Sequence, residues 1–78
     1  MTPADTDALQ RLVTAGHFLQ AAEVLHTLGR SDVAVRLSAL AEARAALAEA
    51  PDDAMRRREH WQARSVVAAV FDVPEDTL

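Results

Sequence analysis

The chain has 78 residues and no cysteine, which allows one domain and excludes both a disulfide-stapled fold and a zinc site built on cysteine. Half of its residues are hydrophobic, a proportion that favours a folded core over disorder. The net charge of −4 disfavours non-specific binding to nucleic acid or to an anionic membrane.

Apolar residues at helical spacing predict two helices in the first 30 residues. The first covers residues 5–15, is capped by Thr2, Asp5 or Thr6, and ends at Gly16. The second covers residues 18–28 and ends at Gly29. The short link between them predicts an antiparallel hairpin. The apolar stripes consist of Ala8, Leu9, Leu12 and Val13 in the first helix and Phe18, Ala21, Ala22, Leu25 and Leu28 in the second.

Two longer helices are predicted in the rest of the chain. The third covers residues 31–50, with Ser31 as its N-cap and Pro51 as its stop. Asp32 and Arg36 are four residues apart and predict an ion pair worth about 0.2–0.5 kcal/mol. The fourth runs from a cap at position 52 or 53 to position 71 or 72, before Pro74. The apolar stripes consist of Val33, Leu37, Leu40, Ala41, Leu47 and Ala48 in the third helix and Met55, Ala63, Val66, Val67 and Val70 in the fourth, with Phe71 at the margin of the fourth.

These segments predict one small all-α domain over residues 1–78, a compact three- to four-helix bundle with antiparallel helical hairpins. We expect the ends, residues 1–4 and 73–78, to be frayed. Seventeen residues are alanine and three are aromatic, so the core is thin. A second copy or a partner often completes a core of this kind.

One face of the fourth predicted helix has an unusual composition. Trp61 lies away from the predicted apolar stripe, and Arg57 and Arg64 are its neighbours one turn away. An aromatic residue between two arginines is a common composition for the centre of a protein interface. The alternative is that Trp61 packs on a neighbouring helix and the arginines form a solvated rim. Both interpretations stay open on the sequence.

No residue pattern indicates a catalytic or metal site. The histidines at positions 17, 26 and 60 do not have the spacing of helical metal ligands. Ser31 is explained as a helix cap, and the carboxylates at 52 and 53 are explained by a helix start. With two glycines in the chain, there is no Gly-rich phosphate loop. We therefore expect no enzyme, no metal, no cofactor and no small-molecule substrate.

Two short stretches resemble known helical motifs. Residues 16–21 resemble the inter-helix turn of a tetratricopeptide repeat, in which Gly, an aromatic residue and Ala recur at this spacing. The resemblance covers about 25 residues, and no second copy follows. It implies peptide or protein binding. Residues 28–36 resemble the turn and recognition-helix start of helix-turn-helix regulators, and residues 67–74 are similar to the closing helix of some repressor-type DNA-binding domains.

The sequence favours a non-enzymatic protein–protein interaction module, such as an antitoxin, a phage-encoded inhibitor or an accessory subunit. Arg57, Trp61 and Arg64 would bind a protein partner, and a homodimer is a further expectation. The alternative is a dimeric DNA-binding regulator that reads DNA with Ser31, Asp32 and Arg36. No apolar run reaches the roughly 18 residues of a membrane span, and the first residues lack a signal peptide pattern. We therefore expect a cytoplasmic protein without membrane contact.

Overall fold

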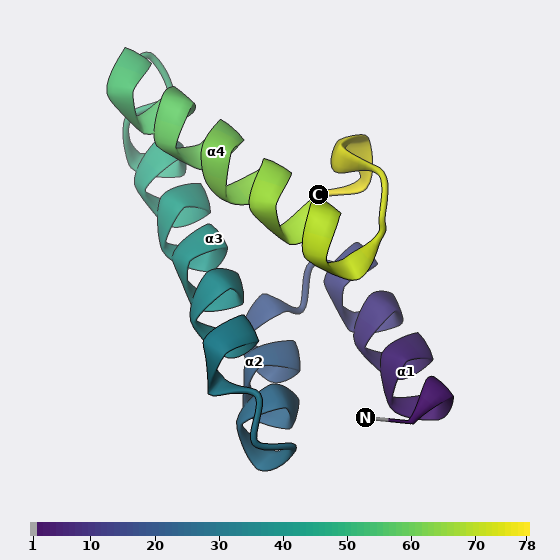
Figure 1. The fold of residues 1–78 in the computed structure, drawn as a ribbon. Helices are drawn as coiled ribbons and strands as arrows, with labels where there is room; N and C mark the ends of the chain where they lie inside the picture. Colours follow the sequence, from purple (N-terminus) through teal and green to yellow (C-terminus); the bar gives the residue numbers. More distant parts are fainter. Residues whose placement is uncertain (1) are drawn as a thin grey trace.

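The computed structural model describes residues 2–78, which form four α-helices and one short 3₁₀ turn (Figure 1). The described residues contain no strand. The structure confirms the predicted all-α helical bundle, and each helix lies within about two residues of its predicted bounds. The elements are α1 (Pro3–Thr14), α2 (Phe18–Thr27), α3 (Ser31–Glu49), α4 (Ala54–Phe71) and η1 (Glu75–Thr77).

Two glycines set the turns between the first three helices. Gly16 has φ +83° and Gly29 has φ +75°, in the left-handed region that glycine enters without steric cost. The amide after each glycine donates back into the preceding helix, from residue 17 to the Leu12 carbonyl at 2.9 Å and from residue 30 to the Leu25 carbonyl at 2.8 Å. Each glycine therefore ends one helix and starts a reversal of the chain.

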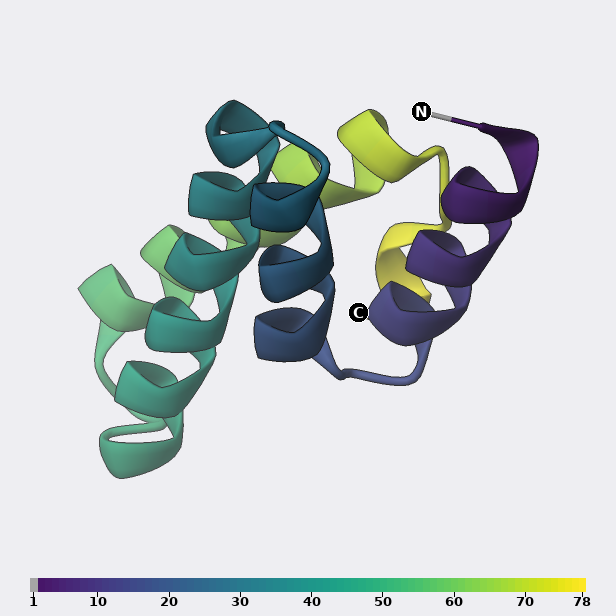
Figure 2. The same ribbon diagram turned by 90° about the horizontal axis from the view of Figure 1, so that it is seen from below.

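The core lies where α2 and α3 pack side by side and α1 and the C-terminal half of α4 close over them (Figures 1 and 2). α1 is tied to the end of α4 by a hydrogen bond that Gln10 Nε2 donates to the Phe71 carbonyl at 2.8 Å. The predicted stripes of the first three helices supply most of this core. It consists of Leu9, Val13, Phe18, Ala21, Ala22, Leu25, Val33, Ala34, Leu37, Leu40, Val67 and Phe71.

The α3–α4 hairpin extends beyond this core as an arm, which we define as residues 41–66. The molecule measures 40 × 21 × 17 Å, and no residue of the arm is buried. Burial ends at Leu40 in α3 and begins again at Val67 in α4. Two helices alone bury only the sides that face each other, so the arm leaves much of its surface in solvent.

The predicted apolar stripe of α4 is right for Val67 and for Ala63, which packs against the core, and wrong for Met55, Val66 and Val70. Val67, Ala68 and Phe71 are buried, whereas Met55 is 70% exposed and Val66 and Val70 are 38% and 45% exposed. The buried face is rotated by about 100° from the predicted stripe. In the arm, this face carries the half-buried His60 and Arg64. Long polar side chains bury their apolar stems and keep the polar head in water. Hydropathy alone therefore does not reveal which side of α4 is buried.

Of the two ends for which the sequence predicts fraying, residue 1 lies outside the described residues, Pro3 begins α1, and residues 75–77 form η1. The Thr2 hydroxyl accepts a hydrogen bond from the Asp5 amide at 3.1 Å, and the Asp5 carboxylate accepts one from the Thr2 amide at 3.2 Å. This reciprocal pair caps α1. At the other end, Val73 and Leu78 are half-buried and pack against the core on either side of η1.

Two predicted interactions at the start of α3 are wrong. Ser31 is the first residue of the helix and makes no cap, and its Oγ lies 3.0 Å from Nδ1 of His26. Asp32 pairs with Nε of Arg30 at 3.4 Å and not with Arg36. Arg30 occupies the cap position, from which its side chain reaches the Asp32 carboxylate, whereas Arg36 lines a groove on the side of α3 that faces α4.

We expect Asp53→Ala to lower the free energy of unfolding by about 1 kcal/mol, within a range of roughly 0.5–2. The Asp53 carboxylate accepts hydrogen bonds from the amides of Met55 at 2.9 Å and Arg56 at 3.1 Å, which caps α4. Urea denaturation followed by circular dichroism measures the change. Asp52→Ala is the matched control, since this exposed neighbour caps no helix, and it should change stability by less than about 0.5 kcal/mol.

Candidate functional site: the basic face of the arm

The three residues predicted to bind a partner lie on one face of α4 in the arm. Arg57 is exposed, Trp61 is 55% exposed and Arg64 is half-buried. Nε of Arg64 is inaccessible to solvent and has no hydrogen-bond partner among residues 2–78. Of the two interpretations of Trp61, the exposure agrees with a surface position and not with packing in the core.

This face continues the buried face of α4. At 100° per residue, Arg57, Trp61 and Arg64 fall in the same sector of about 100° as Ala68 and Phe71. Ala68 and Phe71 are buried, and Phe71 belongs to the hydrophobic core that α1, α2 and α3 also form. Towards the loop at residues 50–53, the same face carries cationic and aromatic side chains instead of apolar ones.

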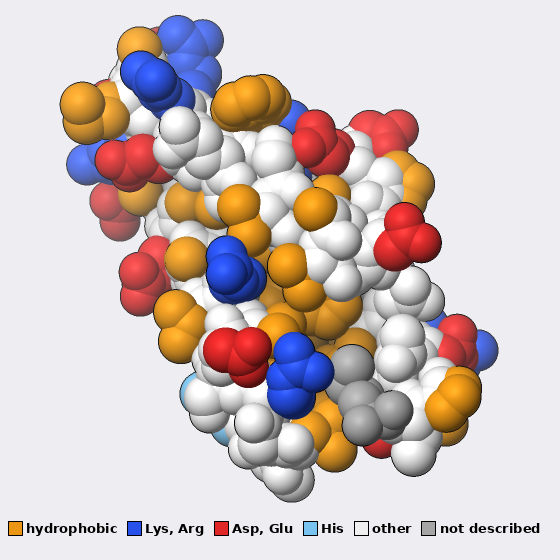
Figure 3. Space-filling model, in the orientation of Figure 1, with side chains coloured by type: hydrophobic (Ala, Val, Ile, Leu, Met, Phe, Trp, Pro, Cys, Tyr) orange, Lys and Arg blue, Asp and Glu red, His pale blue; other side chains and the backbone are white. Residues whose placement is uncertain are grey.

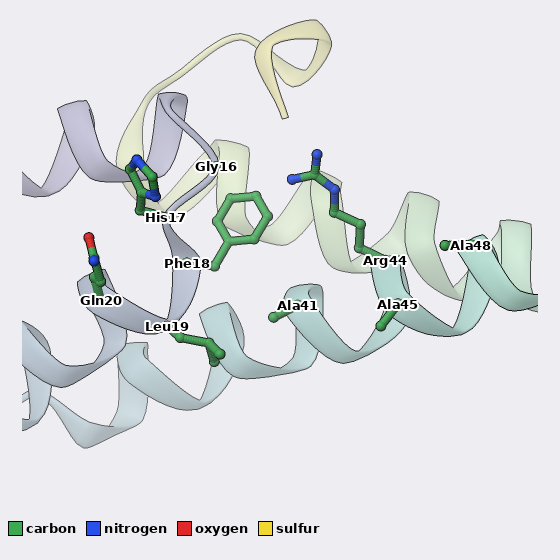
Figure 4. A pocket seen from close by; sticks show the side chains of 9 residues that line it. All are labelled: Gly16, His17, Phe18, Leu19, Gln20, Ala41, Arg44, Ala45 and Ala48. Atoms are coloured by element: carbon green, nitrogen blue, oxygen red, sulfur yellow. The ribbon is translucent and has the colours of Figure 1, made fainter.

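Sequence analysis missed Arg44, which continues the buried face of α3 into the arm as Arg64 continues the buried face of α4. Its guanidinium carbon lies 5.6 Å from the centroid of the Phe18 ring, a cation–π geometry. Figure 4 shows the two side chains turned toward each other where α2 begins. A signal was available, because Arg44 follows Leu37 and Leu40 at helical spacing on the core side of α3.

An open pocket of about 410 Å³ lies beside this contact (Figure 4). Its floor on α3 is formed by Ala41, Ala45 and Ala48, and residues 16–20 close one end. Since α2 begins at Phe18, the pocket lies where the packing of α2 on α3 stops. The pocket is therefore the start of the uncovered part of α3.

The charge of the molecule is divided unevenly. α4 carries four arginines and one glutamate, for a net charge of +3, so the rest of the chain carries −7. α1, α2 and α3 each have a net charge of −1. Figure 3 shows basic side chains gathered at the end of the molecule where α3 and α4 meet.

Most arginines of the arm have no ion pair within residues 2–78. The pairs that form use Arg11, Arg30 and Arg56. Arg56 holds the arm closed, since its Nη1 donates to the Ala46 carbonyl at 2.8 Å and lies 3.7 Å from the Glu49 carboxylate. Among the described residues, Arg36, Arg44, Arg57, Arg58 and Arg64 form no ion pair.

The residues of the alternative DNA-binding interpretation lie apart from this face. Ser31 contacts His26, Asp32 pairs with Arg30, and Arg36 lines a groove between α3 and α4 together with Glu59. The Arg30 guanidinium lowers the pKa of the Asp32 carboxyl, so a negative charge stands at the start of α3. α2 and α3 lie side by side (Figures 1 and 2), whereas the two helices of a helix-turn-helix cross at about 90–120°.

His26 and Ser31 are a histidine and a hydroxyl in contact, at 3.0 Å. Both residues are exposed, and no carboxylate among residues 2–78 bonds to the other ring nitrogen. The described part of the chain also has no group of three or more His, Cys, Asp or Glu side chains placed to hold a metal ion. None of its helices has the length and apolar character needed to cross a membrane.

His60 lies on the basic face, and the direction of its pKa shift predicts that stability depends on pH. Burial, together with the charges of Arg64 on α4 and Arg44 on α3, lowers the pKa of His60 below its usual value. Below about pH 6.5 the unfolded chain takes up a proton that the folded protein does not. We therefore expect the free energy of unfolding to fall from pH 7.5 to pH 5.5, and His60→Gln to reduce this fall. Urea denaturation at the two pH values measures both slopes, and equal slopes would contradict the assignment.

Comparisons of the chain with protein families, with curated proteins and with solved structures found no match.

Proposed function

We propose that this protein is a non-enzymatic protein–protein interaction module and that the arm is its binding surface. The observation that carries the proposal is Trp61, a large aromatic side chain that is 55% exposed and lies near Arg57 and Arg64, which form no ion pair within residues 2–78. Tryptophan and arginine dominate the energetic centres of protein interfaces. A partner that covers Trp61 removes apolar surface from water and gives the arginines anionic groups to bind.

The charge of α4 favours an acidic partner over a second copy of the chain. Two copies packed through α4 would bring together two helices of net charge +3 each. Like charges placed close together across an interface cost several kcal/mol. An acidic partner gains from the same charges and associates faster because of them.

A photo-crosslinking experiment in the source cells tests this function. A benzophenone amino acid at position 61 keeps an aromatic group there, and the same amino acid at position 35 is the control, because Val35 is 63% exposed but lies outside the arm. We expect a discrete adduct to one protein from position 61, unaffected by nuclease, and none from position 35. Crosslinks only to nucleic acid, or no adduct specific to position 61, would contradict the proposal.

A further inference from the structure

The arm carries an uncovered seam, which we define as Ala41, Arg44 and Ala48 on α3 and Arg57, Trp61 and Arg64 on α4. On each helix, these residues are three or four positions apart, the spacing of side chains that face a packed neighbour. On α3 the seam continues the buried row of Leu37 and Leu40. Both rows thus continue a buried face of their helix, and the arm leaves these faces open to a further helix.

In the core, α2 covers the side of α3 that the seam leaves open further along the helix. It packs on α3 as far as Phe18, and the chain then turns away at Gly16, where φ is +83°. A Cβ atom at Gly16 would lie 3.3 Å from Nη1 of Arg44, so the turn sits directly against the start of the seam. A helix placed in line with α2, beyond Gly16, would contact Ala41, Ala45 and Ala48 of α3, which line the pocket.

The seam has cations on both helices and no acidic residue. At 100° per residue, Glu42 and Glu49 lie about 140–160° around α3 from Arg44, and Glu59 lies about 140° around α4 from Arg64. Three arginines of the seam, Arg44, Arg57 and Arg64, have no ion pair within residues 2–78. The complementary surface is one that combines carboxylates with apolar side chains.

We propose that the seam binds an acidic amphipathic helix of the partner protein, laid in line with α2, an inference that rests on the proposed function. The stretch of α3 from Ala41 to Glu49 has nine residues and is about 13 Å long, which matches two to three turns of a bound helix. Its apolar side would cover the alanines and Trp61, and its carboxylates would bind the arginines. No helix within residues 2–78 fits that description, because α1, α2 and α3 each carry a net charge of only −1 and α4 is basic.

A synthetic peptide titrated into the full-length protein tests the seam. The peptide has about 14 residues, with Leu at helical spacing, Glu on the flanks and no Trp. Trp61 is the single tryptophan of the chain, so its fluorescence reports occupation of the seam. We expect saturable binding, and binding at least tenfold weaker by a scrambled peptide of the same composition.

Arginine variants locate the peptide on the surface. Arg57→Gln removes an exposed charge, and we expect it to weaken peptide binding at least threefold. The double variant Arg44→Gln/Arg64→Gln removes two charges from the middle of the seam, and we expect it to weaken peptide binding at least tenfold. Arg11→Gln on α1 is the control, because Arg11 pairs with Asp7, and should leave affinity unchanged. Equal binding of the scrambled peptide, an equal effect of Arg11→Gln, or tighter binding of duplex DNA by the seam would overturn the inference.

The identity of the bound segment separates the two proposals. If the position-61 adduct maps to an acidic helical segment of the partner, both the function and the seam are supported. If it maps to a basic or extended segment, the interaction module stands and the acidic helix is rejected. If position 61 gives no specific adduct, the proposed function fails, whatever the peptide does.

Discussion

Leu37→Ala is expected to lower the free energy of unfolding by about 2–5 kcal/mol. Leu37 is fully buried at the middle of the core, in a row with Val33 and Leu40 on α3. A domain of 78 residues has a total stability of roughly 4–12 kcal/mol. The cavity left by one leucine therefore removes a large part of the stability, because this core contains few large side chains that could close over it.

Urea denaturation followed by circular dichroism measures the loss. Val35→Ala is the matched control on the same helix, since Val35 is 63% exposed, and it should change stability by less than about 0.5 kcal/mol. A loss below 1 kcal/mol for Leu37→Ala would contradict the packing of α2, α3 and α4 around this position.

The ends of the helices were predictable because single residues decide them. Gly16 and Gly29 adopt positive φ values, Pro51 follows the end of α3, and the Asp53 carboxylate caps α4. Each of these signals acts on the local backbone and needs no knowledge of the rest of the fold. The fold class follows from them, since four short helices with brief links have few ways to pack.

The side of α4 that faces the core was not predictable from hydropathy. The predicted stripe included the buried Val67, but it also included Val66 and Val70, which are exposed, and it placed the buried Phe71 only at its margin. The choice depends on how α4 meets α3, α1 and α2 together, which is a tertiary property. In the arm, the inward side carries His60 and Arg64, whose polar heads hide their burial from any apolar pattern.

The candidate site was predictable only where it depends on local sequence and not where it depends on tertiary packing. Trp61 stood out as the single tryptophan beside two arginines, and its position on α4 is local information. Arg44 comes to the same face only because α2 stops at Phe18 and leaves α3 uncovered beyond it. The sequence therefore indicated the residues of the seam on α4, and only the packing of α2 on α3 revealed those on α3.

Trp61→Ala is expected to weaken binding of the crosslinked partner by at least 2 kcal/mol, about 30-fold. Trp61 is the largest apolar side chain of the seam, and covering its exposed part is the main apolar gain that the arm offers a partner. The free energy of unfolding should change by less than about 0.5 kcal/mol, because the side chain is 55% exposed and alanine favours a helix. Isothermal titration calorimetry with the purified partner measures the affinity and urea denaturation the stability.

Met55→Ala is the matched control for this experiment, since Met55 is an apolar residue of α4 that is 70% exposed. It lies about 120° around the helix from Trp61, outside the seam, so its loss should leave the affinity unchanged. An equal loss of affinity in both variants would mean that exposed apolar surface on α4 binds without regard to position. A loss confined to Trp61→Ala would place the partner on the side of the arm where the arginines have no ion pair, because that is the side Trp61 shares with Arg57 and Arg64.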